Sequence, residues 1–290
     1  MHTRSVARSA CLAIESIDEY IMNTEIFATG TTGTIGKYLR NCARPMDIKL
    51  ERDFELPTDL LESADFALIH LAAIVGERAV TKNIELAHQI NVTATRRLAE
   101  KCIESGVKKF VYVSTSHVYR SSVNVLDENC ETNPNTKYSE QKRLAEIAVL
   151  DAFKEMPERL VVARIFSILD WGTPEFTLGG AVLKLLNGEV NNINSGLDLR
   201  VFLTPQKVAC ILMEVAKCDQ LFGIVNICGS NPISIAEAVG RMLSESGRPD
   251  LIARVISEKS SNPIIVGSNK KLLEALPHLE LSWTPSQLRN

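Results

Sequence analysis

The sequence predicts an α/β fold, in which a doubly wound parallel sheet is followed by a small C-terminal lobe. Short apolar runs alternate with helical patterns from residue 25 to residue 228, and this alternation is typical of βαβ units. Glycines follow the first apolar run at a regular spacing, and the pattern loosens after Ser167. The chain of 290 residues is long enough for one large domain with an added lobe.

The strands predicted for the sheet are short apolar runs, as expected where helices cover both faces. They span 25–29, 47–50, 66–72, 109–115, 159–167 and 223–228. The helices predicted between and beyond them span 34–43, 60–64, 83–106, 138–154, 180–187, 207–218 and 234–246. Gly106 is placed to end one of these helices, and Ser234 is placed to cap another. The crossovers between strands should be right-handed.

Residues 1–21 come before the first predicted strand. We expect them to form an extension outside the fold, because Met22 stands just before the strand, where folds of this kind often begin. The alternative is a packed N-terminal helix from about Val6 to Ile21. The apolar run SACLAI in this segment is too short for a signal-peptide core.

The composition excludes several classes of protein. The net charge is −3, with 32 basic and 35 acidic residues spread along the chain, so we expect no nucleic-acid or membrane partner. Seven cysteines are scattered without a CxxC pair, which indicates reduced thiols rather than disulfides or a zinc site. No apolar run approaches the ~18 residues that span a bilayer. We therefore expect a cytoplasmic protein.

The stretch ATGTTGTIG, residues 28–36, places Gly30, Gly33 and Gly36 where the first strand passes into a predicted helix. Helix N-termini bind phosphate, because their N–H groups are unpaired and the helix dipole is positive at this end. A side chain at these positions would obstruct the tight turn or the approach of a pyrophosphate. Taken alone, the stretch fits a plain turn as well as a phosphate cradle.

Two further strand ends carry small or hydroxyl residues. HLAA, residues 70–73, ends the third predicted strand with residues small enough for an adenine or ribose to approach. VSTSHVY, residues 113–119, places the hydroxyls of Ser114, Thr115 and Ser116 at the end of another strand. Ligands of such sheets bind beyond the carboxyl ends of the strands, so these hydroxyls should face the ligand crevice. Each segment by itself also fits an ordinary strand end or turn.

The segment YSEQK places Tyr138 and Lys142 four residues apart, on one face of a predicted helix. A lysine ammonium near a phenol favours the phenolate, so we expect Lys142 to lower the pKa of Tyr138 from its usual value of about 10. Tyr138 would then serve as a general acid or base near neutral pH. A pair of surface residues on a helix can give the same spacing by chance.

In this order and at these strand ends, the motifs resemble those of the extended short-chain dehydrogenase/reductase family, especially its nucleotide-sugar epimerases, dehydratases and reductases. The resemblance covers about residues 22–288 and implies a Rossmann fold with a small C-terminal substrate-binding lobe. The segments that carry it are TGTTGTIG at 29–36, HLAA at 70–73, NVTATRRLAEKC at 91–102, STSHVY at 114–119, YSEQK at 138–142, ARIFSILDWG at 163–172, LRVFLTPQKVA at 199–209 and GIVNICG at 223–229.

The resemblance implies a role for each matching residue. Tyr138 would be the catalytic acid/base, Lys142 its pKa-lowering and ribose-binding partner, and Thr115 the hydroxyl that binds the reacting sugar oxygen. The substrate would meet Thr115, Ser116, Ser167 and Arg200, with Arg200 on a diphosphate. The dinucleotide, NAD or NADP, would be bound by Gly30, Thr32, Gly33, Thr34, Ile35, Gly36, Arg52, Leu71, Ala72, Ala73, Asn91, Ser114, Tyr138 and Lys142. The resemblance implies no metal.

The sequence departs from the family's dehydratases at Ser116 and His117, where those enzymes carry an Asp-Glu pair that eliminates water. The resemblance therefore implies an epimerase or a keto-sugar reductase that transfers hydride, with Tyr138 moving the proton. An acidic residue after the second strand binds a ribose 2′-OH, whereas an arginine binds a 2′-phosphate. The segment ERDFEL resembles the R-D-x-L loop of NADP-using sugar reductases, so we favour NADP, while three solvated charges at 51–53 remain the alternative.

Two other functions stay open, namely an oxidoreductase that acts on a non-sugar carbonyl and an NAD(P)-binding regulator without catalysis. A regulator of this kind usually lacks the tyrosine or the lysine, and both are present here. The predicted organisation is an extension over 1–21, a dinucleotide-binding domain over 22–167 to which 201–228 return, and a substrate-binding lobe over 168–200 and 229–290. A homodimer, if it forms, would use the helices over 83–106 and 138–154.

Overall fold

The computed structural model describes residues 24–40, 42–46, 54–58, 60, 65–120, 122–171, 177–194, 196–255 and 264–285. The predicted extension over 1–21, the predicted strand over 47–50, most of the predicted helix over 60–64, and Arg52 lie outside the described residues. Within these ranges, no helix combines the length and the apolar character needed to cross a membrane.

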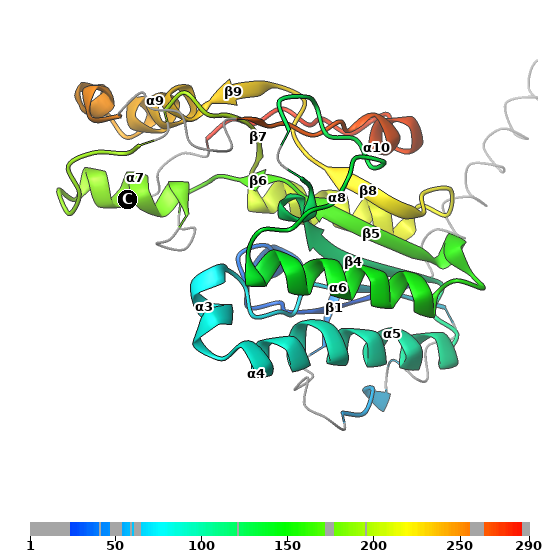
Figure 1. The fold of residues 1–290 in the computed structure, drawn as a ribbon. Helices are drawn as coiled ribbons and strands as arrows, with labels where there is room; N and C mark the ends of the chain where they lie inside the picture. The colour runs from blue at the N-terminus through cyan, green and yellow to red at the C-terminus, as the bar shows by residue number, and fades with distance from the viewer. Residues whose placement is uncertain are drawn as a thin grey trace, which may run out of the picture.

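A six-stranded parallel sheet runs through the molecule in the order β2-β1-β3-β4-β5-β8, which confirms the predicted fold class (Figure 1). Its strands are β1 (Glu25–Thr29), β2 (Arg44–Pro45), β3 (Phe66–His70), β4 (Lys109–Thr115), β5 (Leu160–Ile165) and β8 (Gly223–Ile227). The chain moves outward from β1 to β2 and then returns to the other side of β1. This reversal leaves a crevice at the carboxyl ends of β1 and β3, where ligands of such sheets bind.

The second strand begins earlier than predicted, because Arg44 and Pro45 already pair with Phe27 and Ala28 of β1. Pro45 has no N–H to donate to a further strand, and proline in a sheet is confined to edges and strand ends. The described part of β2 is accordingly exposed at the edge of the sheet.

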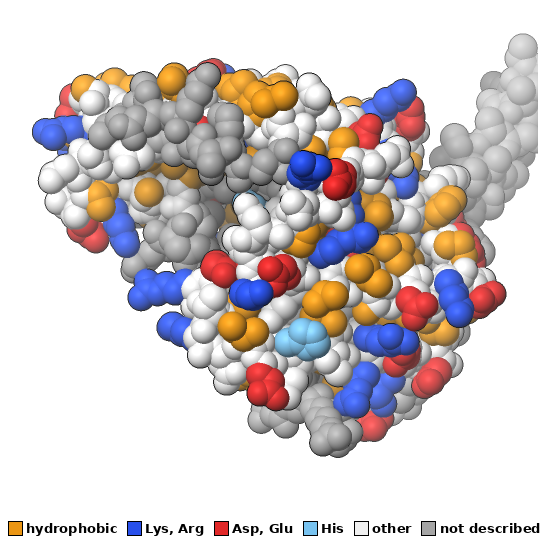
Figure 2. All heavy atoms as spheres, viewed as in Figure 1, with side chains coloured by type: hydrophobic (Ala, Val, Ile, Leu, Met, Phe, Trp, Pro, Cys, Tyr) orange, Lys and Arg blue, Asp and Glu red, His pale blue; other side chains and the backbone are white. Residues whose placement is uncertain are grey.

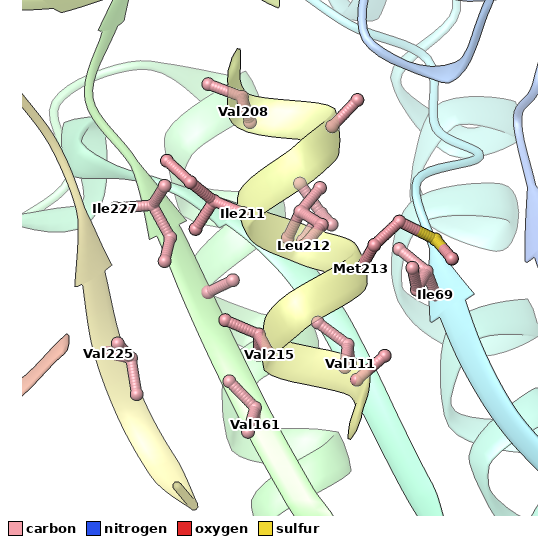
Figure 3. Packing of buried hydrophobic residues seen from close by; sticks show 14 of the residues in the cluster. Ile69, Val111, Val161, Val208, Ile211, Leu212, Met213, Val215, Val225 and Ile227 are labelled. Atoms are coloured by element: carbon pink, nitrogen blue, oxygen red, sulfur yellow. The ribbon is translucent and has the colours of Figure 1, made fainter. Parts of the chain in front are cut away.

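Successive residues of each central strand enter two different apolar layers, as the period of two requires. Ile69 and Val111 belong to one layer, whereas Leu68 and Phe110 belong to the other. The first layer is covered by α8 (Pro205–Lys217), whose apolar side chains point onto β3, β4, β5 and β8 (Figure 3). The second is covered by α5 (Thr95–Glu104) and α6 (Lys137–Ala152). Helices on both faces explain why every residue of β3, β4 and β5 is buried.

The predicted helix over 34–43 was wrong in the described residues, which contain only a 3-10 turn, η1 (Gly36–Tyr38). Glycines and threonines are weak helix formers, and the loop closes instead through the Gly33 N–H and the Gly30 carbonyl at 3.1 Å. The predicted helix over 83–106 is confirmed as a helical run of α4 (Ile84–His88), the π-helix η2 (Gln89–Ala94) and α5, and Gly106 follows it at φ +78°. A short α3 (Glu77–Lys82) precedes it and was not predicted.

A second, smaller sheet lies beside the carboxyl ends of the main strands. It contains β6 (Ser167–Ile168), β7 (Leu199–Leu203), β9 (Pro232–Ser234) and β10 (Ile264–Ile265). Two helices, α7 (Leu178–Leu186) and α9 (Ile235–Glu245), share an apolar cluster with it (Figure 1). The predicted strand over 159–167 is therefore divided, because Ser167 pairs with β7 rather than with the main sheet.

The return of the chain to the main sheet starts later than predicted. Residues 201–203 belong to β7 of the small sheet, and α8 and β8 then rejoin the large one. The remaining described tail adds η5 (Pro249–Arg254) and α10 (Lys270–Ala275), and α10 packs its Leu272 into the layer under α8.

Candidate active site

A crevice of about 350 Å³ opens where the carboxyl ends of β1, β3, β4 and β5 meet. Its walls come from the loop after β1, the loop after β3, the end of β4 and the first turns of α6. The described residues that line it are Gly30, Gly33, Thr34, Ile35, Gly36, Leu71, Ala73, Val75, Val113, Ser114, Thr115, Tyr138, Lys142, Ile165, Phe166, Ile168 and Thr177. The structure thus brings most of the predicted cofactor residues together with all three predicted catalytic residues.

The glycine loop after β1 is a bare backbone surface that side chains would fill. Gly30 has a φ of +69°, and a Cβ there would lie 2.6 Å from the backbone nitrogen of Ala72. A Cβ at Gly36 would overlap the carbonyl oxygen of Gly30 and lie 2.7 Å from the Cα of Thr31. Only glycine therefore lets the loop after β1 fold against the loop after β3. A pyrophosphate fits this cradle of exposed backbone, although no long helix starts here as predicted.

His70 ties the ends of β1 and β3 to α5 beneath the crevice. Its Nδ1 lies 2.7 Å from the hydroxyl of Thr29, and its Nε2 lies 3.0 Å from the hydroxyl of Thr95. The Thr29 oxygen also accepts the N–H of Ala72 at 3.2 Å. Burial, with a smaller contribution from the charge of Lys142, lowers the pKa of His70 to about 3. A neutral His70 is thus a structural part of the HLAA strand end.

Asn91 was predicted to bind the cofactor, and the structure places it under the loop after β3. Its side-chain amide donates to the carbonyl of Ile74 at 3.0 Å and to Oε1 of Gln141 at 3.0 Å, and its Oδ1 accepts the Ile74 N–H at 2.8 Å. Both donors and the oxygen are used within the protein. Asn91 thus shapes the loop that contacts the crevice, and it is not among the described residues that line it.

The first turn of α6 carries Tyr138, and the next turn carries Lys142. Thr136 is the N-cap of this helix, and its side chain forms a capping box with Ser139. Burial raises the pKa of Tyr138 to about 12, so the predicted lowering of this pKa was wrong. The Lys142 ammonium is turned toward β4, where it donates to the Val113 carbonyl at 2.7 Å. Its charge is therefore held by a backbone dipole, and burial of the phenol accounts for the raised pKa of Tyr138.

Lys142 itself is buried against the sheet. Its Nζ lies 4.3 Å from the centroid of the Tyr112 ring, an arrangement that favours a cation. Burial nevertheless lowers the pKa of Lys142 to about 7, against the opposing charge of Glu146. Near neutral pH this amine can hold or release a proton at the edge of the crevice.

Ser114 lines the crevice as predicted, and its hydroxyl donates to Oε1 of Glu146 at 2.6 Å. Glu146 also accepts two hydrogen bonds from Arg164, from Nε at 3.0 Å and from Nη2 at 2.8 Å. Both partners are fully buried. This pair was not predicted from the sequence. Its only signals were an acidic residue among buried positions of a helix and an arginine in the apolar run VARIF.

The predicted substrate residues are spread over two regions. Thr115 lines the crevice, and its hydroxyl accepts the N–H of His117 at 3.3 Å. Ser116 and His117 line a separate small cavity of about 30 Å³ with Ile265. Arg200 pairs in register with Ile265, and its guanidinium lies 3.2 Å from Asp198. The described residues that line the larger crevice do not include Thr32 and Ala72, which were predicted to bind the cofactor. Nor do they include Ser116, Ser167 and Arg200, which were predicted to meet the substrate.

Comparison with family models matches residues 55–204, slightly more than half of the chain, to the NAD dependent epimerase/dehydratase family. A curated relative, the uncharacterized UDP-glucose epimerase YtcB of Bacillus subtilis, is 33% identical over 233 residues, which are 77% of this chain and 72% of the relative. This relative and the family model agree with the motifs that first indicated the family.

Two solved structures show the same fold. One is MoeE5 in complex with UDP-glucose and NAD, which is 22% identical to this chain with a TM-score of 0.72. The match covers 89% of this chain and 94% of the MoeE5 chain. RMD from Pseudomonas aeruginosa, complexed with NADPH, is 21% identical with a TM-score of 0.74, and covers 91% of this chain and 94% of its own. The chain belongs to the NAD dependent epimerase/dehydratase family and is a nicotinamide-dependent enzyme of the extended short-chain dehydrogenase/reductase type.

Proposed function

We propose that this enzyme transfers hydride to or from a nucleotide sugar, as an epimerase or a keto-sugar reductase. The observation that carries the proposal is that a single crevice joins the glycine loop to Thr115, Tyr138 and Lys142. The name of the Bacillus subtilis relative and the UDP-glucose in the MoeE5 complex support a nucleotide-sugar substrate.

The residues around the crevice fit a dinucleotide. Gly30, Gly33 and Gly36 would leave room for the pyrophosphate, and the loop after β3 would cover the rest of the cofactor with Leu71 and Ala73. When bound, the dinucleotide supplies hydride exchange at the carbon that carries the reacting oxygen. The residues of this chain would move the proton and place the reacting oxygen.

In the proposed mechanism Tyr138 moves the proton. At neutral pH Tyr138 holds its proton, so it would donate this proton to the sugar carbonyl oxygen as hydride adds to the carbon. In the oxidising half of an epimerisation, the proton of the sugar hydroxyl would pass to the phenolate of Tyr138. Thr115 would hold the same oxygen by a hydrogen bond. Lys142 would return the phenol to its protonated form or stabilise the phenolate, because its own pKa lies close to neutrality.

We do not propose dehydration. The dehydratases of the family carry an Asp-Glu pair directly after the catalytic threonine to eliminate water, and this chain has Ser116 and His117 there. Arg200 remains our candidate for the diphosphate of the substrate, and Ser116 and Ser167 remain candidates for the sugar. Burial, and after it the charge of Arg200, lowers the pKa of His117, so β7 and the segment after β4 lie near each other beside the smaller cavity.

Replacing Tyr138 by phenylalanine tests the proton transfer. We expect Tyr138→Phe to lower kcat by about 10²–10⁴, because general acid catalysis is lost while the ring remains. Cofactor affinity, measured by fluorescence titration, should stay close to that of the wild type. The assay follows both the sugar product and the absorbance of the reduced cofactor, because net reduction consumes cofactor and epimerisation does not.

A matched control is Tyr112→Phe, which removes a hydroxyl for which no partner is found among the described residues and keeps the ring beside Lys142. It should retain turnover. Equal turnover in Tyr138→Phe and the wild type would refute the role of Tyr138.

The protonation of Lys142 should affect stability above pH 7. In the unfolded chain this amine has a pKa near 10.4, and in the folded protein about 7, so the unfolded chain binds more protons between these values. The lysine therefore destabilises the fold at neutral pH, and this penalty disappears as the pH rises. Relative to Lys142→Met, the wild type should gain about 2–3 kcal/mol between pH 7 and pH 9.5 in urea unfolding.

The exposed Lys154→Met serves as the control, and its curve should run parallel to that of the wild type. Parallel curves for Lys142→Met as well would show that Lys142 does not change its charge in this range.

We also propose that the enzyme prefers NADP, with Arg52 receiving the 2′-phosphate. The proposal rests on the sequence ERDFEL, since residues 51–53 lie outside the described structure. In calorimetry, Arg52→Ala should weaken NADP(H) binding about tenfold or more and leave NAD(H) binding unchanged, because a charge-assisted bond to the phosphate is lost. Equal affinity of the wild type for both cofactors would count against discrimination by this loop.

A homodimer is the assembly we propose, through the face formed by α4 and α6. Leu144 and Ile147 of α6 are 46% and 49% exposed, and Ile84 and Leu86 of α4 are similarly exposed. Figure 2 shows apolar side chains among charged ones over this helical face. Large apolar side chains left exposed on neighbouring helices are typical of an interface.

The double variant Leu144→Glu with Ile147→Glu should be a monomer in analytical ultracentrifugation under conditions where the wild type is a dimer, because it buries two charges in the interface. Val123→Glu, at a residue that is 75% exposed outside this face, is the control and should not change the mass. A monomeric wild type would contradict the proposal.

A further inference from the structure

One carboxylate connects the loop after β3 directly to the residue that we assign to proton transfer. Oε2 of Glu77 accepts the backbone N–H of Tyr138 at 2.9 Å, across 61 positions of sequence. We propose that Glu77 is a positioning residue for Tyr138, because it fixes the first turn of α6 against the wall of the crevice. The inference rests on the proposed role of Tyr138 in the reaction.

The N–H of Tyr138 is one of the donors that an α-helix leaves unpaired at its start. Thr136 is the N-cap, and its side chain takes the N–H of Ser139, while its carbonyl takes the N–H of Glu140. The capping box therefore leaves Tyr138 to a partner from outside the helix. Glu77 supplies a charged acceptor there, at the positive end of the α6 dipole, where a carboxylate stabilises the helix.

Glu77 stands at the end of the loop that forms one wall of the crevice. Leu71, Ala73 and Val75 of this loop line the crevice, and Glu77 is the first residue of α3. The middle of the loop is held separately, since Asn91 binds both the N–H and the carbonyl of Ile74. The loop is thus fixed near its centre by η2 and at its end by α6.

This arrangement sets the separation between the loop and the phenol. Glu77 is exposed and takes no part in the apolar layers, so its loss leaves the core intact. Loss of the Glu77 carboxylate removes the hydrogen bond that holds the backbone N–H of Tyr138 to the end of the loop. Small displacements of a reacting group lower the rate strongly, so the effect should appear in turnover rather than in folding.

The test compares Glu77→Ala with Glu77→Gln, which keeps an oxygen acceptor at the same distance. Glu77→Ala should lower kcat roughly 10- to 100-fold, with the KM for the nucleotide sugar nearly unchanged. Glu77→Gln should recover most of this loss. Amide hydrogen exchange in peptides over 136–142 should rise roughly tenfold in Glu77→Ala, because the N–H of Tyr138 loses its partner.

Glu85→Ala, at another exposed glutamate in a helix first turn, is the matched control and should match the wild type in both measurements. The melting temperature of Glu77→Ala should stay within about 2 °C of the wild type. Wild-type kcat or wild-type exchange in Glu77→Ala overturns the inference, even if Tyr138→Phe is inactive. If no nucleotide sugar is turned over, the proposed function fails, and the exchange result still decides whether Glu77 holds α6.

Discussion

The buried ion pair between Glu146 and Arg164 is the interaction on which the position of the reaction centre depends. Glu146 belongs to α6 and Arg164 belongs to β5. The carboxylate also accepts hydrogen bonds from Ser114 of β4 and from Arg143 of α6. Removing one partner of a buried pair typically costs about 3–5 kcal/mol, a large part of the stability of a domain. The pair therefore fixes α6 on the sheet at the strand ends, where Thr115 and the glycine loop lie.

The charges around the crevice are arranged so that one amine can change its protonation near neutral pH. Lys142 lies near Glu146, whose charge raises the pKa of Lys142, and near His70, whose pKa is lowered by the charge of Lys142. The neutral state of His70 removes a second positive charge from this region, and the charge of Lys142 helps to keep His70 neutral. Burial of Lys142 and of Tyr138 then moves their pKa values in opposite directions, toward proton release by the amine and proton retention by the phenol.

The parts of the structure that the sequence predicted are those set by local pattern. Buried strands can be recognised in a sequence as short apolar runs. The spacing of four residues between Tyr138 and Lys142 places them on the same face of a helix. The direction of the Tyr138 pKa could not be predicted, because it depends on burial and on where the Lys142 ammonium finds an acceptor. The contacts that Asn91 and Glu77 make could not be predicted for a similar reason, since their partners belong to segments that are distant in the sequence. The glycine loop was mistaken for a helix start because glycines at a turn and at a helix N-terminus look alike in sequence.

Three contacts, spaced along one face of α6, place its reactive side chains. Glu77 holds the N–H of Tyr138 in the first turn, Asn91 holds Gln141 in the second, and Glu146 is held by Arg164 in the third. These partners belong to α3, η2 and β5, so the helix is fixed relative to three separate segments. Tyr138, Lys142 and Glu146 follow one another at intervals of four residues, and Gln141 stands next to Lys142, so these side chains lie on one side of α6. The side of α6 that carries Tyr138 and Lys142 is therefore also the side that is held in place. A helix held at only one of these points could rotate or slide. A helix held at all three keeps Tyr138 and Lys142 in the same crevice as Thr115, which stands on a strand of the sheet to which α6 is bound.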